Sequence, residues 1–194
     1  NSFAHRSIHD GLMHACGHDG HTAMLMAAAK YISQELEFSG TLNLIFQPAE
    51  EYPGGAKLMI EQGLFEKFPC DAIFAAHNMP GIQAGQLVFI EGPAMASSDD
   101  VTITLTGLGG HGAMPHLTQD PIIAAASMVM ALQTIVSRNV NPLQTAVITV
   151  GSLVAGKANN VIPNSARLEL SVRALDREVR DLLQARILAL VSAQ

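Results

Sequence analysis

The sequence predicts an α/β protein with two domains, and the main reason is a change in hydrophobic pattern near Ser97. Before Ser97 the candidate strands are short, nearly continuous apolar runs, which are typical of parallel strands covered on both faces. After Ser97 the candidate strands alternate apolar and polar residues, which is typical of an antiparallel sheet with one wet face. A length of 194 residues by itself allows one large domain or two small ones. We therefore predict one domain at residues 1–97 and another at residues 98–194.

Helical and apolar segments alternate in the first half of the sequence. We predict helices at residues 21–36 and 55–62, and buried strands at residues 41–47 and 71–76. Gly63 follows the second helix, as glycine commonly does at a helix end. Short links join the strands and helices in the order of a βαβ unit, so we expect a parallel sheet between helices.

The second half follows the order β-α-β-β-α. We predict strands at residues 101–106, 145–150 and 167–173, and a helix at residues 121–137. A last helix follows Asp176, whose side chain is a suitable N-cap. This order matches a split-βαβ, ferredoxin-like sandwich without its final strand. Because no Gly, Asn or Pro ends the last helical pattern, we expect the chain to be an internal piece of a longer protein.

Composition excludes several classes of protein. Lys and Arg number 11 against 17 Asp and Glu, a net charge of −6, so the basic patch of a nucleic-acid binder or of a protein held on an anionic membrane is absent. The longest apolar stretch, residues 121–136, is shorter than the ~20 residues of a membrane-spanning helix. Two cysteines cannot form a disulfide framework. This favours a reducing compartment, and we expect a cytoplasmic protein.

The segment MHACGHDGH, residues 13–21, gathers candidate metal ligands just before a predicted helix. Cys16, His18 and His21 offer thiolate and imidazole groups, which suit zinc and its borderline neighbours. The glycines of the segment allow the backbone to turn tightly, so that several side chains can converge. A buried cysteine beside helix-capping residues, or a Cys–His nucleophile pair, would leave the same pattern.

Two adjacent carboxylates, Glu50 and Glu51, follow the strand predicted at residues 41–47. Open α/β sheets place their sites at such strand ends, although a solvated acidic loop is the alternative. Adjacent side chains point in different directions, so one can bind a metal while the other remains free as a base. His77 ends the next apolar run, where it is either a further ligand or a hydrogen-bonded structural histidine. The three segments together are similar to a di-metal hydrolase site.

The second half carries three further candidates. His111 lies in the glycine-rich loop GLGGHGAMP, which lacks the following helix of a phosphate-binding loop and so does not predict nucleotide binding. Asn160 lies in the polar turn ANNVIP, and Arg173 ends the wet face of a predicted strand. On the residues alone, these two are a turn and a solvated charge.

These motifs, in this order, resemble those of a known enzyme family. MHACGHDGHTAM, QPAEE followed by GGA, AAHNMP, GGHGAMPH and NVIP are similar to motifs of the metallopeptidase family of aminoacylases and carboxypeptidases. The amidohydrolase branch, with bacterial hippurate hydrolases and plant auxin–amino-acid conjugate hydrolases, is the most similar. The resemblance covers essentially the whole chain. It implies a zinc-peptidase-like α/β catalytic domain, partial in this chain, interrupted by a ferredoxin-like lid that also dimerises.

The resemblance assigns a metal centre to the first domain. It implies that Cys16 bridges two divalent ions, which could be Zn, Mn, Co or Ni. It implies that the remaining ligands in this chain are His18, Glu51 and His77. Glu50 then corresponds to the general base. An Asp upstream and a last histidine ligand downstream lie in family segments that this chain does not contain, so we expect the isolated 194 residues to be inactive.

The resemblance assigns substrate contacts to the lid. It implies that His111 reaches the active site of a second subunit, where it binds substrate and takes part in catalysis. Asn160 and Arg173 match positions associated with substrate binding. We therefore expect a homodimer joined through the lid, which acts on a small N-acyl amino acid or short peptide.

The sequence favours metal-dependent hydrolysis of the amide bond of N-acyl amino acids such as hippurate. Three alternatives stay open: a dipeptidase or aminopeptidase on the same scaffold, a metal-binding dimerisation module without catalysis, and a cysteine-nucleophile hydrolase. The Glu50–Glu51 pair argues against the second, because such a module needs no free base beside a ligand. The third would survive chelation and be inactivated by thiol alkylation.

Overall fold

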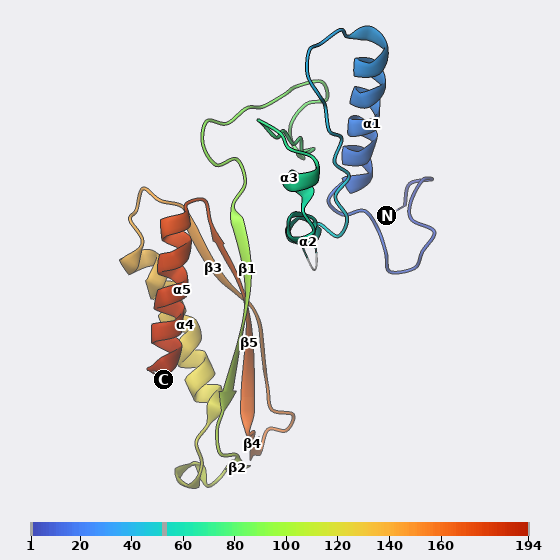
Figure 1. Ribbon diagram of the computed structural model, residues 1–194. Coiled ribbons are helices and arrows are strands. Elements are labelled where there is room, and N and C mark those ends of the chain that lie inside the picture. The colour runs from blue at the N-terminus through green and yellow to red at the C-terminus, as the bar shows by residue number, and fades with distance from the viewer. Residues whose placement is uncertain (1, 52–53, 194) are drawn as a thin grey trace. The chain divides into compact units, whose positions relative to one another are not determined.

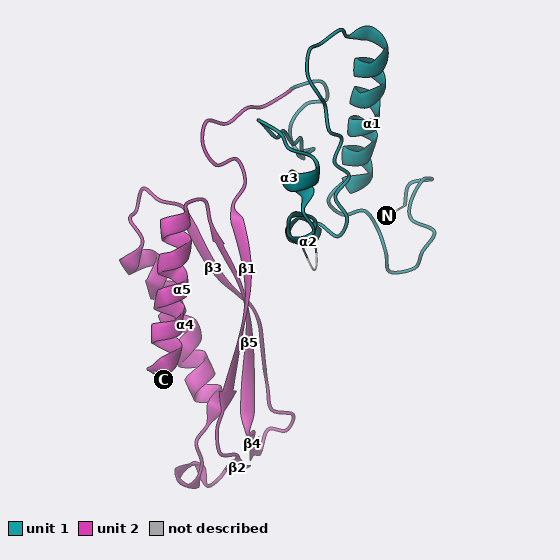
Figure 2. Ribbon diagram, in the orientation of Figure 1, with its two compact units in different colours: residues 1–86 teal, residues 87–194 magenta. Residues whose placement is uncertain are grey.

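The structure, a computed structural model, describes residues 2–51 and 54–193. The chain forms two compact units, residues 1–86 and residues 87–194 (Figures 1 and 2). The change of hydrophobic pattern at Ser97 coincides with the start of β1. Residues 87–96 lead into this strand as part of the second unit.

The described residues of the first unit form three helices: α1 (His18–Glu35), α2 (Gly55–Glu61) and α3 (Leu64–Lys67). The helix predicted at residues 55–62 is confirmed, whereas α1 begins earlier than the predicted residue 21. Gly17 precedes α1 with a φ of 75°, a left-handed conformation that favours glycine. The turn at this glycine places His18 and His21 in the first turns of α1.

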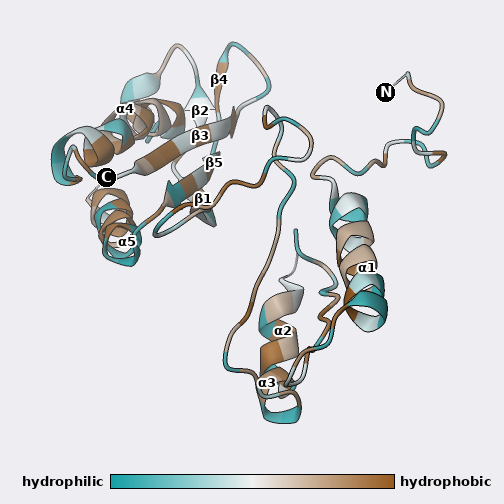
Figure 3. Ribbon diagram, turned by 90° about the horizontal axis from the view of Figure 1, so that it is seen from above, coloured by the Kyte–Doolittle hydropathy of each residue, from teal (hydrophilic) through white to brown (hydrophobic). Residues whose placement is uncertain are grey.

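The two strands predicted in the first unit are wrong for this structure. Residues 41–47 and 71–76 form no strand, and every hydrogen-bonded ladder among the described residues belongs to the second unit. The apolar side chains of these runs are exposed, for example Phe46 at 50% and Phe74 at 91%. Apolar colour runs along the non-helical segments of this unit (Figure 3). A strand requires a hydrogen-bonded neighbour and a covered face, and the described part of the first unit supplies neither to these segments.

The second unit contains a three-stranded antiparallel sheet with the order β1-β5-β3. Its elements in chain order are β1 (Ser97–Thr106), β2 (Gly110–His111), η1 (Pro115–Leu117), α4 (Pro121–Asn139), β3 (Ala146–Ala155), β4 (Val161–Ile162), β5 (Ser165–Ala174) and α5 (Arg177–Ser192). The predicted β-α-β-β-α order is confirmed. The short pair β2–β4 is an addition, because two-residue strands leave no detectable period in a sequence.

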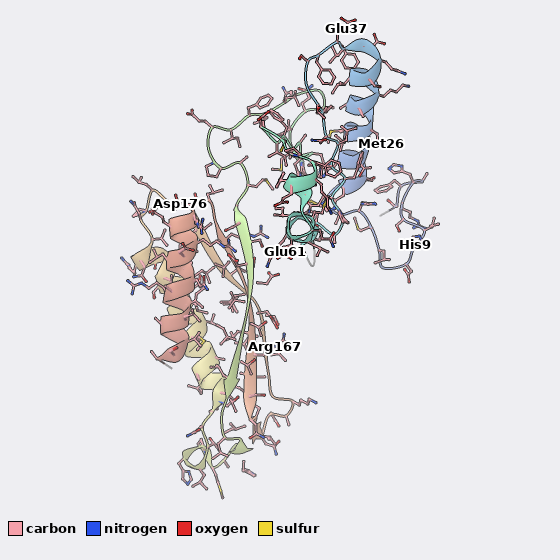
Figure 4. All side chains as sticks on the ribbon, in the orientation of Figure 1. His9, Met26, Glu37, Glu61, Arg167 and Asp176 are labelled. Carbon is pink, nitrogen blue, oxygen red and sulfur yellow. The ribbon has the colours of Figure 1, made fainter. Side chains whose placement is uncertain are left out.

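Both long helices of the second unit cover the same face of the sheet (Figure 1). The core between these helices and the sheet includes Met128 and Leu132 of α4, Leu168 of β5 and Leu183 of α5, all fully buried. Arg167 lies on the opposite, exposed face of β5 (Figure 4). The predicted alternation of buried and wet residues is therefore observed, with the helices on the apolar side.

Local capping fixes where the two long helices begin. The Asp120 carboxylate accepts a hydrogen bond from the Ile122 N–H at 2.8 Å, just before Pro121 at the first helical position. Asp176 accepts from the N–H groups of Glu178 and Val179, as predicted for an N-cap (Figure 4). Such caps satisfy backbone donors that have no partner within the helix.

Helix α4 meets a length and hydropathy criterion for crossing a membrane. Its apolar stripe, however, packs into the core of the second unit through Ala125, Met128, Leu132 and Ile135. Core helices of folded domains meet the same criterion, and the buried stripe of α4 shows that it is one of them, although Ile123 and Met130 of the same helix are exposed.

Candidate metal centre and a glycine-rich arm

Two segments of the first unit bring together thiol, imidazole and carboxylate groups. Cys16 precedes α1, His18 is the first residue of α1, and Glu51 lies in the loop before α2. One ligand atom from each of these residues lies within 4.8 Å of the others. Thiolate, imidazole and carboxylate are the protein ligands of zinc and related divalent ions. The observed donor set and spacing therefore fit a divalent cation.

His77 joins this group from a third segment. Its Nε2 atom lies 3.4 Å from the Sγ atom of Cys16. The other ring nitrogen, Nδ1, lies 2.5 Å from the backbone oxygen of Asn78 and donates its proton there. Nε2 then carries a free lone pair on the side of Cys16. A hydrogen bond of this kind orients ligand histidines and fixes their tautomer.

The two neighbouring carboxylates both approach the same imidazole. His18 Nε2 lies 3.3 Å from Glu50 Oε2 and 3.7 Å from Glu51 Oε1. Only Glu51 belongs to the three-residue group described above. Both carboxylate side chains are more than half exposed, at 60% and 72%. Glu50 thus borders the candidate centre and is open to solvent in this chain, which is compatible with a free base.

A tight loop holds this carboxylate pair. Ala49 has a φ of 49°, a left-handed conformation that is strained for a residue with a side chain. The Gly55 N–H donates to the Ala49 oxygen at 2.9 Å and closes the loop. A Cβ atom on Gly55 would overlap the Pro48 carbonyl oxygen. The sequence QPAEE followed by GGA therefore encodes a backbone that turns sharply on both sides of Glu50 and Glu51.

Asn78 and His21 complete the surroundings of the centre. The Asn78 N–H donates to His21 Nε2 at 3.1 Å, and the Asn78 side chain contacts the same nitrogen. The His21 ring lies edge-on to His77, with centroids 4.3 Å apart. A Cβ atom on Gly17 would overlap the Asn78 side chain, so the glycine makes room for this contact. His21 is among the ligand candidates of MHACGHDGH, whereas no residue pattern predicts a role for Asn78, because an asparagine after a histidine is not a ligand signature.

The second unit carries His111 and Asn160 on what we call the glycine-rich arm, residues 107–119 together with residues 160–164. Within it His111 pairs with Val161 in the β2–β4 ladder. The Gly112 N–H donates to the Asn160 oxygen at 2.8 Å. The arm thus brings His111 and Asn160 together, and both are exposed.

Arg173 lies elsewhere. The arm adjoins the end of the sheet where Thr106 pairs with Ser165, whereas Arg173 pairs with Ser98 near the opposite end of β1. At about 3.3 Å per residue, the path along β5 from Ser165 to Arg173 is about 26 Å. One copy of the second unit therefore does not bring Asn160 and Arg173 to the same small molecule. The sequence leads us to expect both Asn160 and Arg173 at a substrate site. Within one copy of the second unit they are too far apart to contact the same small substrate.

Comparison with known proteins identifies the family. Peptidase family M20/M25/M40 matches residues 1–164 of the chain. The chain belongs to this family. The family resemblance inferred from the sequence motifs is thereby confirmed, as is the α/β fold class.

The chain is also similar in sequence to curated enzymes with names of hydrolases and deacetylases. The chain is 51% identical over 183 residues to a hippurate hydrolase of Campylobacter jejuni, covering 94% of this chain and 48% of the relative. It is 46% identical over 184 residues to an N-acetyl-L-cysteine deacetylase of Bacillus subtilis, covering 94% of this chain and 44% of the relative. The chain spans about half the length of the curated relatives that it matches.

Two solved M20-type structures resemble the chain along nearly its whole length. A putative aminohydrolase from methicillin-resistant Staphylococcus aureus has a TM-score of 0.85 and 36% identity, covering 98% of this chain and 51% of that one. The Bacillus subtilis YXEP protein, described as a dinuclear metal-binding peptidase, has a TM-score of 0.73 and 34% identity, covering 98% of this chain and 48% of that one. At these identities the likeness extends beyond the fold to the family.

Proposed function

We propose that the protein containing this chain is a metal-dependent amidohydrolase that cleaves the amide bond of N-acyl amino acids, with hippurate-like compounds as the leading substrates. The observation that carries the proposal is the convergence of Cys16, His18 and Glu51 donor atoms within 4.8 Å in a chain of the M20 family. The names of the hippurate hydrolase and deacetylase relatives support the substrate class.

In this proposal Cys16, His18, Glu51 and His77 hold two divalent ions, which could be Zn, Mn, Co or Ni. When bound, such ions lower the pKa of a water molecule and polarise a carbonyl group. Cys16 would be the ligand shared by the two ions, because its sulfur belongs to the group with His18 and Glu51 and also lies 3.4 Å from His77 Nε2. His77 is held for this role by its hydrogen bond to the Asn78 backbone.

Glu50 is the proposed proton carrier. Its carboxylate lies 3.3 Å from His18 but outside the three-residue group, so it remains free to exchange a proton. It would take a proton from the attacking water and deliver it to the leaving amine. Proton transfer by a positioned side chain typically contributes about 10²–10⁴-fold in rate. The exposure of Glu50 gives a substrate access to this carboxylate.

The lid residues would act on the substrate. His111 Nδ1 accepts a hydrogen bond from the Ala113 N–H at 3.0 Å, so in the neutral ring the proton resides on Nε2. Nε2–H would donate to the oxyanion that develops on the carbonyl oxygen. Asn160 would bind a polar group of the same substrate, because the arm holds it beside His111. Arg173 would bind a substrate carboxylate through its fork of donors.

A homodimer joined through the second unit is part of the proposal. Arg173 and the His111–Asn160 pair lie towards opposite ends of one sheet, so a single small substrate can meet both only if they come from different copies. The sheet order β1-β5-β3 leaves outer edges on β1 and β3 with unpaired backbone groups, which are suited to pairing with a second copy. We propose a cytoplasmic location on the basis of cysteine usage.

The test uses the full-length protein and measures amino-acid release from benzoyl- and acetyl-amino acids and from dipeptides. Assays are run before chelation, after chelation, and after adding back Zn, Mn, Co or Ni, with metal content determined in parallel. We expect turnover of N-acyl amino acids that disappears with the metal and returns with it. Turnover of dipeptides without turnover of N-acyl amino acids would change the proposed substrate class from N-acyl amino acids to peptides. Turnover that survives complete metal removal would overturn the proposal and favour Cys16 as a nucleophile.

A further inference from the structure

Asn164 occupies the base of the glycine-rich arm, between β4 and β5. Its side-chain oxygen Oδ1 accepts a hydrogen bond from the Gly109 N–H at 2.9 Å. Its backbone oxygen accepts another from the Gly107 N–H at 2.8 Å. One residue therefore holds two positions of the segment that leads from β1 to His111.

The glycines of the arm are required by space. A Cβ atom on Gly107 would overlap the Gln119 carbonyl oxygen, and one on Gly109 would overlap the Ile162 carbonyl oxygen. A Cβ atom on Gly112 would lie 3.0 Å from the Asn160 oxygen. At Gly109 and Gly112 the two halves of the arm thus approach closely through their backbones. Apolar side chains of the arm are largely exposed, for example Leu108 at 55% and Leu117 at 62%, so hydrogen bonds contribute much of what holds its shape.

The hydrogen bonds continue from Asn164 to the functional end of the arm. Gly110 pairs with Ile162, His111 pairs with Val161, and the Gly112 N–H binds the Asn160 oxygen. His111 itself is fixed twice, since its ring accepts from the Ala113 N–H and its backbone oxygen accepts from the Met114 N–H at 2.8 Å. A change in the path of Gly107–Gly109 would therefore move the His111 ring relative to Asn160.

We infer that Asn164 is a positioning residue for hydrolysis: its Oδ1 atom holds the Gly109 backbone and thereby sets the placement of His111 and Asn160. This inference rests on the proposed function in one respect, namely that His111 and Asn160 act on the substrate. The placement of the arm by Asn164 stands apart from that function and can be measured without it.

The test compares variants of the full-length protein at this one position. Asn164→Ala removes the acceptor, and Asn164→Gln keeps the amide but moves its oxygen by one methylene. Asn164→Asp retains an oxygen where Oδ1 lies. The matched control is Asn141→Ala: the Asn141 Oδ1 accepts from the Leu143 N–H at 3.1 Å in another exposed turn, before β3. That turn is near the end of the sheet away from the arm.

Two readouts report placement directly. NMR hydrogen exchange measures protection of the Gly109 amide, and ¹⁵N shifts of the His111 ring report its tautomer. We expect faster Gly109 exchange and a mixture of His111 tautomers in the Ala and Gln variants, with wild-type behaviour in the Asp variant and in Asn141→Ala. Unchanged Gly109 exchange and an unchanged His111 tautomer in the Ala and Gln variants would overturn the inference.

Turnover of hippurate reports the consequence. Loss of a single oxyanion donor costs about 10²–10³ in kcat, and a residue that acts through the backbone should cost less, about tenfold. We expect this loss in kcat for the Asn164→Ala and Asn164→Gln variants, with their metal content unchanged. The control Asn141→Ala should keep the wild-type kcat. A merely stabilising role would lower Tm but leave kcat per folded molecule and the His111 tautomer unchanged.

If Asn164→Ala does not fold, the Gln and Asp variants decide the question. If the wild type shows no turnover, the proposed function fails while the two NMR readouts still test Asn164.

Discussion

The Sγ atom of Cys16 lies 3.4 Å from the Nε2 atom of His77, although 61 residues separate the two in the chain. One residue precedes α1, and the other follows the apolar run at residues 71–76. Their approach joins the histidine-rich N-terminal segment to a distant loop of the same unit. This contact adds a fourth ligand-type residue to the group formed by Cys16, His18 and Glu51.

The first prediction concerns the cysteine. Cys16→Ser should weaken binding of divalent ions by at least about 10–100-fold, because even a change to a residue that only hydrogen-bonds to a metal ligand lowers metal affinity by this factor. Competition with a chromogenic chelator measures the affinity. The control is Cys70→Ser, since Cys70 is a free and exposed cysteine. Equal losses in the two variants would contradict the assignment of Cys16 as a ligand.

The second prediction separates the two neighbouring carboxylates. Glu50→Gln should lower turnover by about 10²–10⁴-fold while metal content stays unchanged, because proton transfer is lost and the ligands remain. Glu51→Gln should lose metal, because its carboxylate belongs to the converging group. Metal analysis and turnover are measured on the same preparations. Loss of metal in Glu50→Gln, with retention in Glu51→Gln, would exchange the two roles.

The third prediction concerns the loop that holds these carboxylates. Gly55→Ala should impair metal binding and turnover together, since the new Cβ atom would overlap the Pro48 carbonyl oxygen and displace the loop. Gly20→Ala is the matched control: a Cβ atom there meets no atom within 4 Å, and Gly20 lies in α1. The control should be neutral or stabilise the helix by up to about 1 kcal/mol. Metal titration and thermal unfolding distinguish the two variants.

The fourth prediction concerns an ion pair between β1 and α5. The Arg180 guanidinium donates two hydrogen bonds to the Asp99 carboxylate, one of them 2.8 Å long from Nε. These bonds hold the pKa of Asp99 below its usual value and raise the pKa of Arg180. Both side chains are partly exposed, at 31% and 50%, so the pair is worth at most about 1 kcal/mol.

The sign of its pH dependence follows from the lowered pKa. The stabilisation by Asp99 is fully present above the unfolded-state pKa of about 3.9 and disappears as the pH falls through the lower folded-state value. Asp99→Asn should therefore lower the free energy of unfolding at neutral pH, and the difference from wild type should shrink on acidification. Urea unfolding at several pH values measures it. Asp100→Asn, at an exposed neighbour on the other face of β1, should show little effect. A difference that grows on acidification would contradict the assignment.

Much of the second unit was predictable because its signals are local. Alternating residues gave the strands, Asp176 marked the start of α5, and the β-α-β-β-α order gave the topology. Each of these signals depends on neighbours within a few residues, where chain geometry fixes which side chains share a face. The short β2–β4 pair escaped prediction because its partners are two residues each and about 50 positions apart, as the pairing of Gly110 with Ile162 shows.

The first unit shows the limit of such signals. The apolar runs at residues 41–47 and 71–76 record a preference for burial, but a strand forms only when another segment supplies its hydrogen bonds. The motifs supplied the residue types of the centre and, by family resemblance, their expected roles. The motif AAHNMP contains Asn78 but gave it no role, because the contact of Asn78 with His21 depends on the path of the chain.

The sequence by itself determined the family, the candidate ligands and the elements of the second unit, because these depend on residue identity and short-range periodicity. The tertiary structure alone decided which residues meet. It placed Cys16 beside His77, fixed His111 beside Asn160 on one arm, and separated Arg173 from both along β5. Distances across tens of residues depend on how turns and hydrogen bonds direct the backbone, and no local pattern encodes that path.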